Sequence, residues 1–385
     1  MRARDAVPRR PVRFLFVLPS LQLGGAERQA LLLARDLAER ERAHVQVWGF
    51  GEPGPVVSAA ERLGIEGRSV PLPPGGARVD QVRFTAWFVR QVRRAAADVL
   101  LPYSRVPNRL CGLTWRWAGA RLCVWNHRDG GNMSAPTRAD RWAMRRTPVV
   151  VSNSRHGAEF LARAYAIPLS RIAVVHNGVE LAPARDDRAA WRARLGAGER
   201  TFVASMLANL TSNKDHANLL RAWRTVVDVM GRSRLEALLV LAGFPGETAP
   251  ALERLAADLR LAASVRFTGQ IDDVTGLLEA SDLGVFSSRH EGSPNGVLEC
   301  MAARLAVVGT DIDGIREAVG EAGYPYLAPS GDHESFAGHI LALANDPALR
   351  TEIGRENRGR VTSIFSPTRM GARMAGLFAA HLEQR

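Results

Sequence analysis

The sequence contains no long apolar run and few cysteines. No stretch reaches the roughly 18 apolar residues that a membrane-spanning helix needs. The apolar segment 14–21 follows a basic start, but it lacks a small-residue cleavage site and runs into Gly24-Gly25, so we interpret it as a strand and not a signal peptide. Cys111, Cys123 and Cys300 have neither metal-ligand spacing nor the even number of a disulfide framework. We therefore expect a reducing, cytoplasmic setting and no metal site.

Lysine is nearly absent as well. Lys214 is the only lysine among 51 basic residues, and all the others are arginines. A bias of this kind reflects the composition of a genome, so a single retained lysine invites a functional interpretation. Lys214 stands directly before a predicted helix, where an ammonium group can meet a bound anion. The alternative is an ordinary exposed lysine.

The charge is unbalanced, but it is not concentrated. The formal net charge is +12, and the bases are spread along the chain apart from a short run at its start. Aromatic residues make up 6% of the chain and do not alternate with the bases, as a stacking platform for nucleic acid would require. We therefore expect no nucleic-acid partner. Peripheral contact with the anionic inner face of a membrane, near a lipid-linked acceptor, is one interpretation of the excess charge.

The pattern of strands and helices predicts the fold. At 385 residues the chain is long enough for two domains. Strands are predicted at 12–19, 43–48, 67–71, 97–101, 120–125, 148–151 and 171–175, and again at 201–207, 236–242, 264–268, 283–287, 305–309 and 324–327, with helical patterns between most of them. This alternation predicts two Rossmann-like α/β domains with parallel sheets, whose ligands bind at the carboxyl ends of the strands. The chain lacks the G-x-G-x-x-G motif, which argues against NAD or FAD, and we expect no cofactor.

The stretch 287–320 carries the clearest chemistry. A strand runs into a polar loop that contains Glu291, and a helix begins near Pro294 and carries Glu299. A helix N-terminus after a glycine-containing loop offers backbone N–H groups to an anion. Carboxylates accept hydrogen bonds from sugar hydroxyls, so the combination indicates a site for a sugar joined to a phosphate. A pair of surface glutamates beside an ordinary strand and helix is the alternative.

This stretch resembles the Glu-x7-Glu signature of the GT4 family, which comprises retaining glycosyltransferases of the GT-B fold. In that family the first glutamate contacts the donor sugar and the second holds the ribose of the nucleotide, and these positions match Glu291 and Glu299. The resemblance places the donor diphosphate at the start of the helix. The segment concerned is Ser293, Pro294, Asn295, Gly296 and Val297. The stretch Asp311-Ile-Asp313 looks like a metal motif of another glycosyltransferase fold, an interpretation that we reject within this pattern.

Three other segments of the second half complete the resemblance. The family places a lysine before the first helix of this domain, with an arginine five residues earlier, to neutralise the donor diphosphate. Lys214 fits the first position, but Asn209 stands at the second and removes one charge from the site. The backbone of Gly269, Gln270 and Ile271, after a predicted strand, is the expected contact for the nucleotide base.

The first half carries weaker motifs. Gly24-Gly25 is similar to the family loop that approaches the donor phosphates, although it could be a tight turn without a ligand. His127 follows a predicted strand, in the position where GT4 enzymes place a histidine beside the reacting sugar. We expect Arg128, Asp129 and Asn132 to line an acceptor pocket, with a polar helix-capping loop as the alternative.

The resemblance implies a retaining, metal-independent glycosyltransferase. It would move a sugar from a UDP- or GDP-linked donor to a glycan or lipid-linked acceptor in cell-surface polysaccharide synthesis, with His127, Lys214 and Glu291 as catalytic residues. We expect an acceptor domain at 12–181, a donor domain at 182–364 facing it across a cleft, and a C-terminal helix at 365–385 that crosses back to the first domain. A sugar-nucleotide epimerase or phosphorylase of the same fold, or a non-catalytic nucleotide-sugar binder, stays open.

Overall fold

The computed structural model describes residues 10–128 and 135–383 and divides the chain into two compact units. Unit 1 comprises 1–178 and 367–385, and unit 2 comprises 179–366. The chain therefore passes between the units twice, at 178/179 and at 366/367. The domain boundaries predicted from the sequence lie at 181/182 and 364/365. In the described part of the chain, no helix is both long enough and apolar enough to span a membrane.

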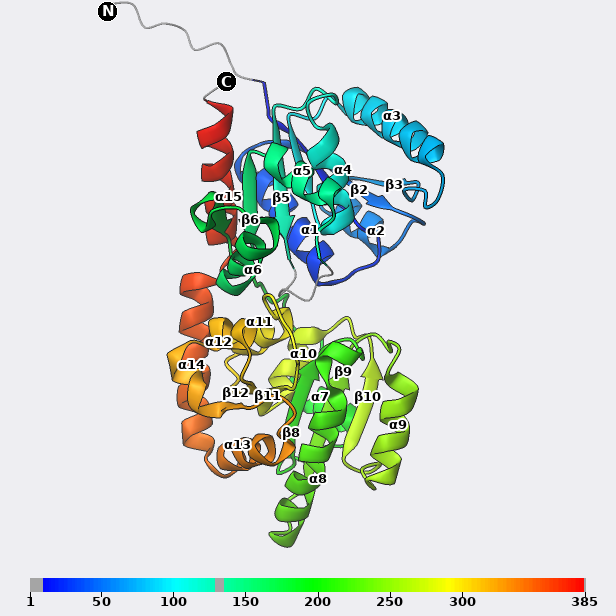
Figure 1. Cartoon of the computed structure of the whole chain (residues 1–385). Helices are drawn as coiled ribbons and strands as arrows, with labels where there is room; N and C mark the ends of the chain where they lie inside the picture. Colours follow the sequence, from blue (N-terminus) through cyan, green and yellow to red (C-terminus); the bar gives the residue numbers. More distant parts are fainter. Residues whose placement is uncertain (1–9, 129–134, 384–385) are drawn as a thin grey trace, which may run out of the picture. The chain divides into compact units, whose positions relative to one another are not determined.

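Unit 1 is a parallel sheet of seven strands in the order β3-β2-β1-β4-β5-β6-β7. Its elements are β1 (Arg13–Leu18), α1 (Gly25–Arg40), β2 (His44–Phe50), α2 (Pro55–Arg62), β3 (Glu66–Val70), α3 (Arg78–Ala95), β4 (Val99–Pro102), α4 (Arg105–Thr114), β5 (Leu122–His127), α5 (Arg138–Arg146), β6 (Val149–Ser152), α6 (Arg155–Tyr165), η1 (Leu169–Arg171), β7 (Ile172–Val174) and α15 (Pro367–Leu382). Figure 1 shows the sheet with helices on both faces.

Unit 2 is a parallel sheet of six strands in the order β10-β9-β8-β11-β12-β13. Its elements are α7 (Arg188–Leu195), β8 (Phe202–Leu207), η2 (Ser212–Lys214), α8 (His216–Arg232), β9 (Ala237–Ala242), α9 (Ala249–Asp258), β10 (Val265–Gly269), α10 (Val274–Ala280), β11 (Leu283–Phe286), α11 (Asn295–Ala302), β12 (Val307–Thr310), α12 (Asp313–Val319), η3 (Glu321–Tyr326), β13 (Leu327–Ala328), α13 (His333–Asn345) and α14 (Pro347–Ile364).

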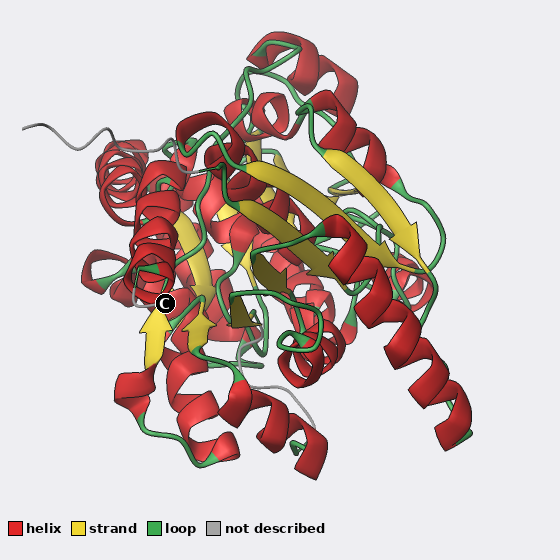
Figure 2. Ribbon diagram, turned by 90° about the horizontal axis from the view of Figure 1, so that it is seen from above, coloured by secondary structure: helices red, strands yellow, loops and turns green. Residues whose placement is uncertain are grey.

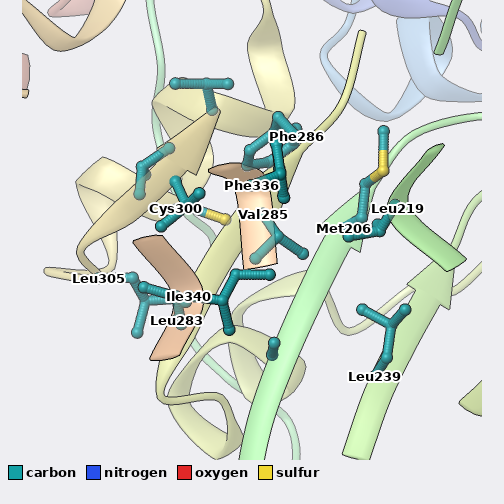
Figure 3. Packing of buried hydrophobic residues seen from close by; sticks show 14 of the residues in the cluster. Met206, Leu219, Leu239, Leu283, Val285, Phe286, Cys300, Leu305, Phe336 and Ile340 are labelled. Atoms are coloured by element: carbon teal, nitrogen blue, oxygen red, sulfur yellow. The ribbon is translucent and has the colours of Figure 1, made fainter. Parts of the chain in front are cut away.

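Both sheets bury apolar residues on both faces, as parallel sheets do. In β1, Phe14 and Phe16 belong to one buried cluster, and Leu15 and Val17 to another on the opposite face. In unit 2 the main cluster packs β8, β9 and β11 against α8, α11 and α13, and Figure 3 shows part of it. The strands lie between layers of helices, as Figure 2 shows by colour. The predicted fold class, two Rossmann-like α/β domains, is confirmed.

The C-terminal helix α15 belongs to unit 1. Met370, Met374 and Phe378 are buried in the same cluster as Phe14, with the Phe14 and Phe378 ring centroids 5.2 Å apart. Gly371 permits this packing, since a Cβ there would lie 1.8 Å from an oxygen of Asp36 on α1. Helix α15 therefore packs on unit 1 through apolar contacts, although it follows unit 2 in the sequence.

Two predicted boundaries were wrong. Strand β5 continues through Asn126 and His127, which pair with Val151 and Ser152 of β6, so these polar residues belong to the ladder. The strand predicted at 324–327 is mostly the short helix η3, and β13 keeps only Leu327 and Ala328. Proline cannot donate a ladder hydrogen bond, which explains why the segment around Pro325 is not a strand.

Asp273 joins the first segment of unit 2, before and within α7, to the start of α10. Its carboxylate accepts hydrogen bonds from the backbone N–H groups of Arg185, Asp186 and Gly276, each at 3.1 Å, and from Trp191 Nε1 at 2.7 Å. Burial by itself would raise the pKa of this carboxyl, but the four hydrogen bonds outweigh it and lower the pKa to about 2. The ionised carboxylate therefore stabilises the folded state.

We expect Asp273→Asn to lower the free energy of unfolding by about 2–3 kcal/mol at neutral pH, because charge-assisted hydrogen bonds are lost. A depressed folded-state pKa contributes stability that is fully present above the unfolded value of 3.8 and is lost as the pH falls toward 2. Urea unfolding from pH 7 downward should show the variant and the wild type converging in acid. As a control, Asp228→Asn removes an exposed helical pair with Arg224 and should cost about 0.5 kcal/mol at most. A difference at Asp273 that does not change with pH would contradict this account.

Candidate active site

A lysine and a glutamate meet at the carboxyl edge of the unit 2 sheet. Lys214 ends η2, which follows β8, and Glu291 lies in the loop after the neighbouring strand β11. The Lys214 ammonium is paired with the Glu291 carboxylate, and Ser288 donates from Oγ to Glu291 Oε1 at 2.7 Å. The two paired side chains are only 22% and 11% exposed. The structure thus brings together two of the three residues predicted to be catalytic.

The loops that carry this pair are fastened to each other. Arg289 donates its backbone N–H to the Asn213 carbonyl at 2.8 Å, and Ser287 donates from Oγ to the Lys214 carbonyl at 3.0 Å. The Arg289 side chain also pairs with the buried carboxylate of Asp215 at 2.8 Å. Asp215 has a φ of +47°, which is rare for a residue with a side chain, and it turns the chain directly into α8. Lys214 is therefore held in place from several sides.

The N-terminus of α11 lies beside this pair, and two glycines allow the close approach. A Cβ at Gly296 would lie 2.3 Å from the Leu207 carbonyl oxygen at the end of β8, and one at Gly314 would lie 2.4 Å from the Glu291 carbonyl oxygen. Pro294 is the N-cap of α11 and Val297 is buried on its first turn. Glu299 is half-buried on the second turn, and Ser293 and Asn295 are half-buried at the start. Helix, loop and strand end thus converge on one small region.

Asn209, where the resemblance expects arginine, has a definite role in the structure. Its side-chain oxygen accepts a hydrogen bond from the Phe244 backbone N–H at 3.0 Å, and Leu210 donates to the Phe244 carbonyl at 3.0 Å. The amide of Asn209 therefore fixes the turn after β9. The adjoining Gly243 donates to the Gly269 carbonyl at 3.0 Å, which connects this turn to the predicted base-contacting segment. In that segment Gln270 is exposed and Ile271 is half-buried.

Asp311 and Asp313, which resemble a metal motif, have other positions and contacts in the structure. Asp311 pairs with Arg316, and Asp313 is the first residue of α12. Across residues 10–128 and 135–383, no group of three or more His, Cys, Asp or Glu side chains is placed to hold a metal ion.

In unit 1, Gly24 is the N-cap of α1 and Gly25 is its first residue. A Cβ at Gly24 would lie 2.6 Å from Glu27 Oε2, so the glycine leaves room for a carboxylate in the first turn. Glu27 is 6% exposed, and burial raises the pKa of its carboxyl. Glu27 is not among the site residues predicted from the sequence. The sequence signal that could have pointed to Glu27 is its place in the first turn of a predicted helix that begins at Gly24-Gly25.

His127 and Arg128 lie at the carboxyl edge of the unit 1 sheet. His127 is 2% exposed and its ring stacks on Phe160, with the centroids 5.8 Å apart. The Arg128 guanidinium donates to Asn177 Oδ1 at 2.8 Å and lies 4.8 Å from the centre of the Tyr103 ring. Asp129 and Asn132 lie outside the described residues. Sequence reasoning missed Tyr103 and Asn177 beside Arg128, and Ser288, Arg289 and Asp215 beside Lys214, because these contacts join distant parts of the chain.

Two parallel α/β units, one with a lysine–glutamate pair close to a helix N-terminus, are the arrangement expected of a GT-B glycosyltransferase. Residues 23–183 match the family model described as Glycosyltransferase Family 4, and residues 201–346 match the one described as Glycosyl transferases group 1. The chain belongs to the GT4-type glycosyltransferases, as the Glu-x7-Glu pattern predicted.

Particular relatives show how far the likeness extends. EpsD, named a glycosyltransferase of Bacillus subtilis (strain 168), is 32% identical over 193 residues, which is 50% of this chain and 49% of EpsD. The D-inositol 3-phosphate glycosyltransferase of Streptomyces avermitilis is 29% identical over 233 residues, 58% of this chain and 48% of that protein. The chain thus spans about half the length of these relatives in the matched regions. The crystal structure of Anabaena Alr3699/HepE with UDP and glucose has a TM-score of 0.84 at 18% identity, covering 96% of this chain and 100% of that one, and shows a shared fold.

Proposed function

We propose that the chain is a retaining, metal-independent glycosyltransferase that uses a UDP- or GDP-linked sugar. The observation that carries the proposal is the convergence of Lys214, Glu291 and the α11 N-terminus at the edge of the unit 2 sheet. A cation and helix N–H groups suit a diphosphate, and a carboxylate beside them suits sugar hydroxyls. HepE, which has the same fold, was solved with UDP and glucose, and this supports a nucleotide-sugar as the donor.

Donor binding is expected to break the ion pair between Lys214 and Glu291. Lys214 and Glu291 neutralise each other in the structure described here. An arriving diphosphate competes with Glu291 for the ammonium, and the carboxylate is then available to accept hydrogen bonds from the sugar. Glu299, on the second turn of α11, is the proposed contact for the ribose. When the complete donor binds, Lys214 and Glu291 exchange each other for the diphosphate and the sugar. Before the donor binds, neither charge is buried without a partner.

In the proposed reaction, the bond from the anomeric carbon to the diphosphate oxygen breaks and a bond from that carbon to an acceptor hydroxyl oxygen forms. The hydroxyl proton passes to the leaving phosphate on the same face of the sugar, which retains the configuration. Lys214 and the N–H groups at the start of α11 stabilise the negative charge that develops on the leaving group. Glu291 orients the sugar and does not attack it. We propose His127 and Arg128 on the acceptor side, and a glycan or lipid-linked acceptor at the inner face of a membrane.

Calorimetric titration of UDP, GDP and ADP, alone and as sugar conjugates, tests the donor site. We expect one nucleotide to bind the wild type and to bind Glu299→Ala roughly 10- to 100-fold more weakly, because hydrogen bonds from ribose hydroxyls to a carboxylate are lost. The matched control is Glu253→Ala, an exposed glutamate on α9 of the same unit. No binding of any nucleotide to the wild type would overturn the proposal. Binding without turnover on any acceptor would favour a non-catalytic binder.

A further inference from the structure

Exposed apolar side chains gather around one helix of unit 1. Val79 and Val82 on α3 are 59% and 68% exposed, and Leu72 in the preceding loop is 66% exposed. Trp117, which is 54% exposed, lies at the other end of the helix, since Arg93 donates from Nε to the Trp117 carbonyl at 2.7 Å. Single exposed apolar side chains are ordinary in proteins, whereas a group of them along one element marks an interaction surface.

The packing of α3 fixes which side of the helix is exposed. Phe88 and Val92 are fully buried against the sheet, and the Phe84 ring lies 6.4 Å from that of Phe88. These positions are four residues apart and define the inner side. The opposite side is an outer stripe whose members are all exposed: Val79, Val82, Arg83, Ala86, Arg90 and Arg94. Figure 1 shows α3 at the margin of unit 1, beside the strands β2 and β3.

The outer stripe is cationic as well as apolar. Helix α3 contains Arg78, Arg83, Arg90, Arg93 and Arg94 but only one acid. That acid, Asp80, lies 4.0 Å from Arg83 and offsets only one of the five charges. Valines at one end, arginines at the other and a tryptophan beside them are the composition of a surface that lies in a lipid interface. A second copy of this chain is a poorer partner, because two such stripes would repel each other.

We propose that the outer stripe, with Leu72 and Trp117, docks the chain on an anionic lipid bilayer. The apolar side chains enter the boundary between headgroups and acyl chains, and the arginines lie against lipid phosphates. Helix α3 connects two parallel strands, so its N-terminal turns with Val79 and Val82 point toward the carboxyl edge of the sheet. His127 and Arg128 lie at that same edge. If the proposed function holds, the stripe thus brings the acceptor side toward a membrane-held acceptor.

Flotation of the full chain with vesicles tests the surface directly. We expect binding to vesicles of equimolar phosphatidylcholine and phosphatidylglycerol at low salt and little binding to pure phosphatidylcholine. Arg90→Gln/Arg94→Gln should weaken binding roughly 25-fold, since each base near an anionic surface contributes about fivefold. Val79→Ser/Val82→Ser should weaken binding to the same vesicles by at least about tenfold, through lost apolar burial.

Matched variants elsewhere separate this surface from general basicity. Arg232→Gln/Arg254→Gln removes two exposed arginines of unit 2, and Leu169→Ser/Val229→Ser removes two exposed apolar side chains on η1 and α8. Both controls should bind vesicles like the wild type. Equal losses in stripe and control variants, or no vesicle binding by the wild type, would overturn the proposal. So would a wild-type dimer in sedimentation that the valine variant dissociates. Nucleotide titration is unaffected by these changes, so failure of the docking surface and failure of the donor site can be told apart.

Discussion

Replacing Lys214 by alanine is expected to lower kcat for sugar transfer by roughly 100- to 1,000-fold, the loss found when a preorganised group that stabilises developing charge is removed. Lys214 is the only lysine of the chain and is paired with Glu291 in a largely buried position. Without it, the proposed diphosphate site loses the lysine ammonium, and Glu291 keeps a charge that only the Ser288 hydroxyl offsets among the contacts described. Single-turnover transfer with the bound nucleotide-sugar measures the effect on the chemical step.

Companion variants identify the cause of that loss. Lys214→Arg retains the charge but not the compact ammonium, so we expect it to recover part of kcat. Glu291→Gln combined with Lys214→Ala removes both members of the pair, and their coupling energy follows from the double-mutant cycle. Arg254→Gln, at an exposed position of α9, is the neutral control. A Lys214→Ala enzyme with unchanged kcat would remove Lys214 from the mechanism.

The elements around Glu291 in unit 2 could be predicted from the sequence, for a physical reason. The strand at β11, the polar loop and the start of α11 follow one another within the chain, so local patterns define them. The ends of parallel strands meet at one edge, which is why Glu291, Glu299 and Lys214 could be expected in one region. That Lys214 pairs with Glu291 could not be predicted. The two residues are 77 positions apart, and their contact depends on side-chain conformations that the fold determines.

The misjudged positions show the same limit. The continuous apolar run of β5 ends at Trp125, but its ladder continues through Asn126 and His127, which pair with Val151 and Ser152 of β6. His127 is consequently buried within the strand and stacked on Phe160, whereas it was predicted to follow the strand. Asn209 was judged only as a missing arginine, whereas its amide fixes the Phe244 turn. Polar residues in tertiary hydrogen bonds leave no periodic signal in the sequence.

The substitution Gly314→Ala is expected to lower kcat/KM for sugar transfer by about 100-fold. A loss of this size is typical when a reacting group is misplaced by about 1 Å. The Cβ of Gly314→Ala would lie 2.4 Å from the Glu291 carbonyl oxygen and 2.8 Å from its carbonyl carbon, so the loop must move. Because backbone atoms are struck, no side-chain rotation can relieve the contact. Glu291 would then be displaced from its proposed contact with the sugar, whereas Glu299 stays on α11.

This displacement predicts a specific pattern of binding. UDP or GDP alone, held through its diphosphate and ribose, should bind Gly314→Ala nearly as well as the wild type, whereas the sugar conjugate should lose its additional affinity. Gly338→Ala on α13 is the matched control, because a Cβ there meets nothing within 4 Å and the change should stabilise the helix by about 0.5–1 kcal/mol. Equal weakening of nucleotide and nucleotide-sugar would mean that the glycine supports the whole edge of the sheet. Selective loss of the sugar conjugate would assign recognition of the transferred sugar to the Glu291 loop.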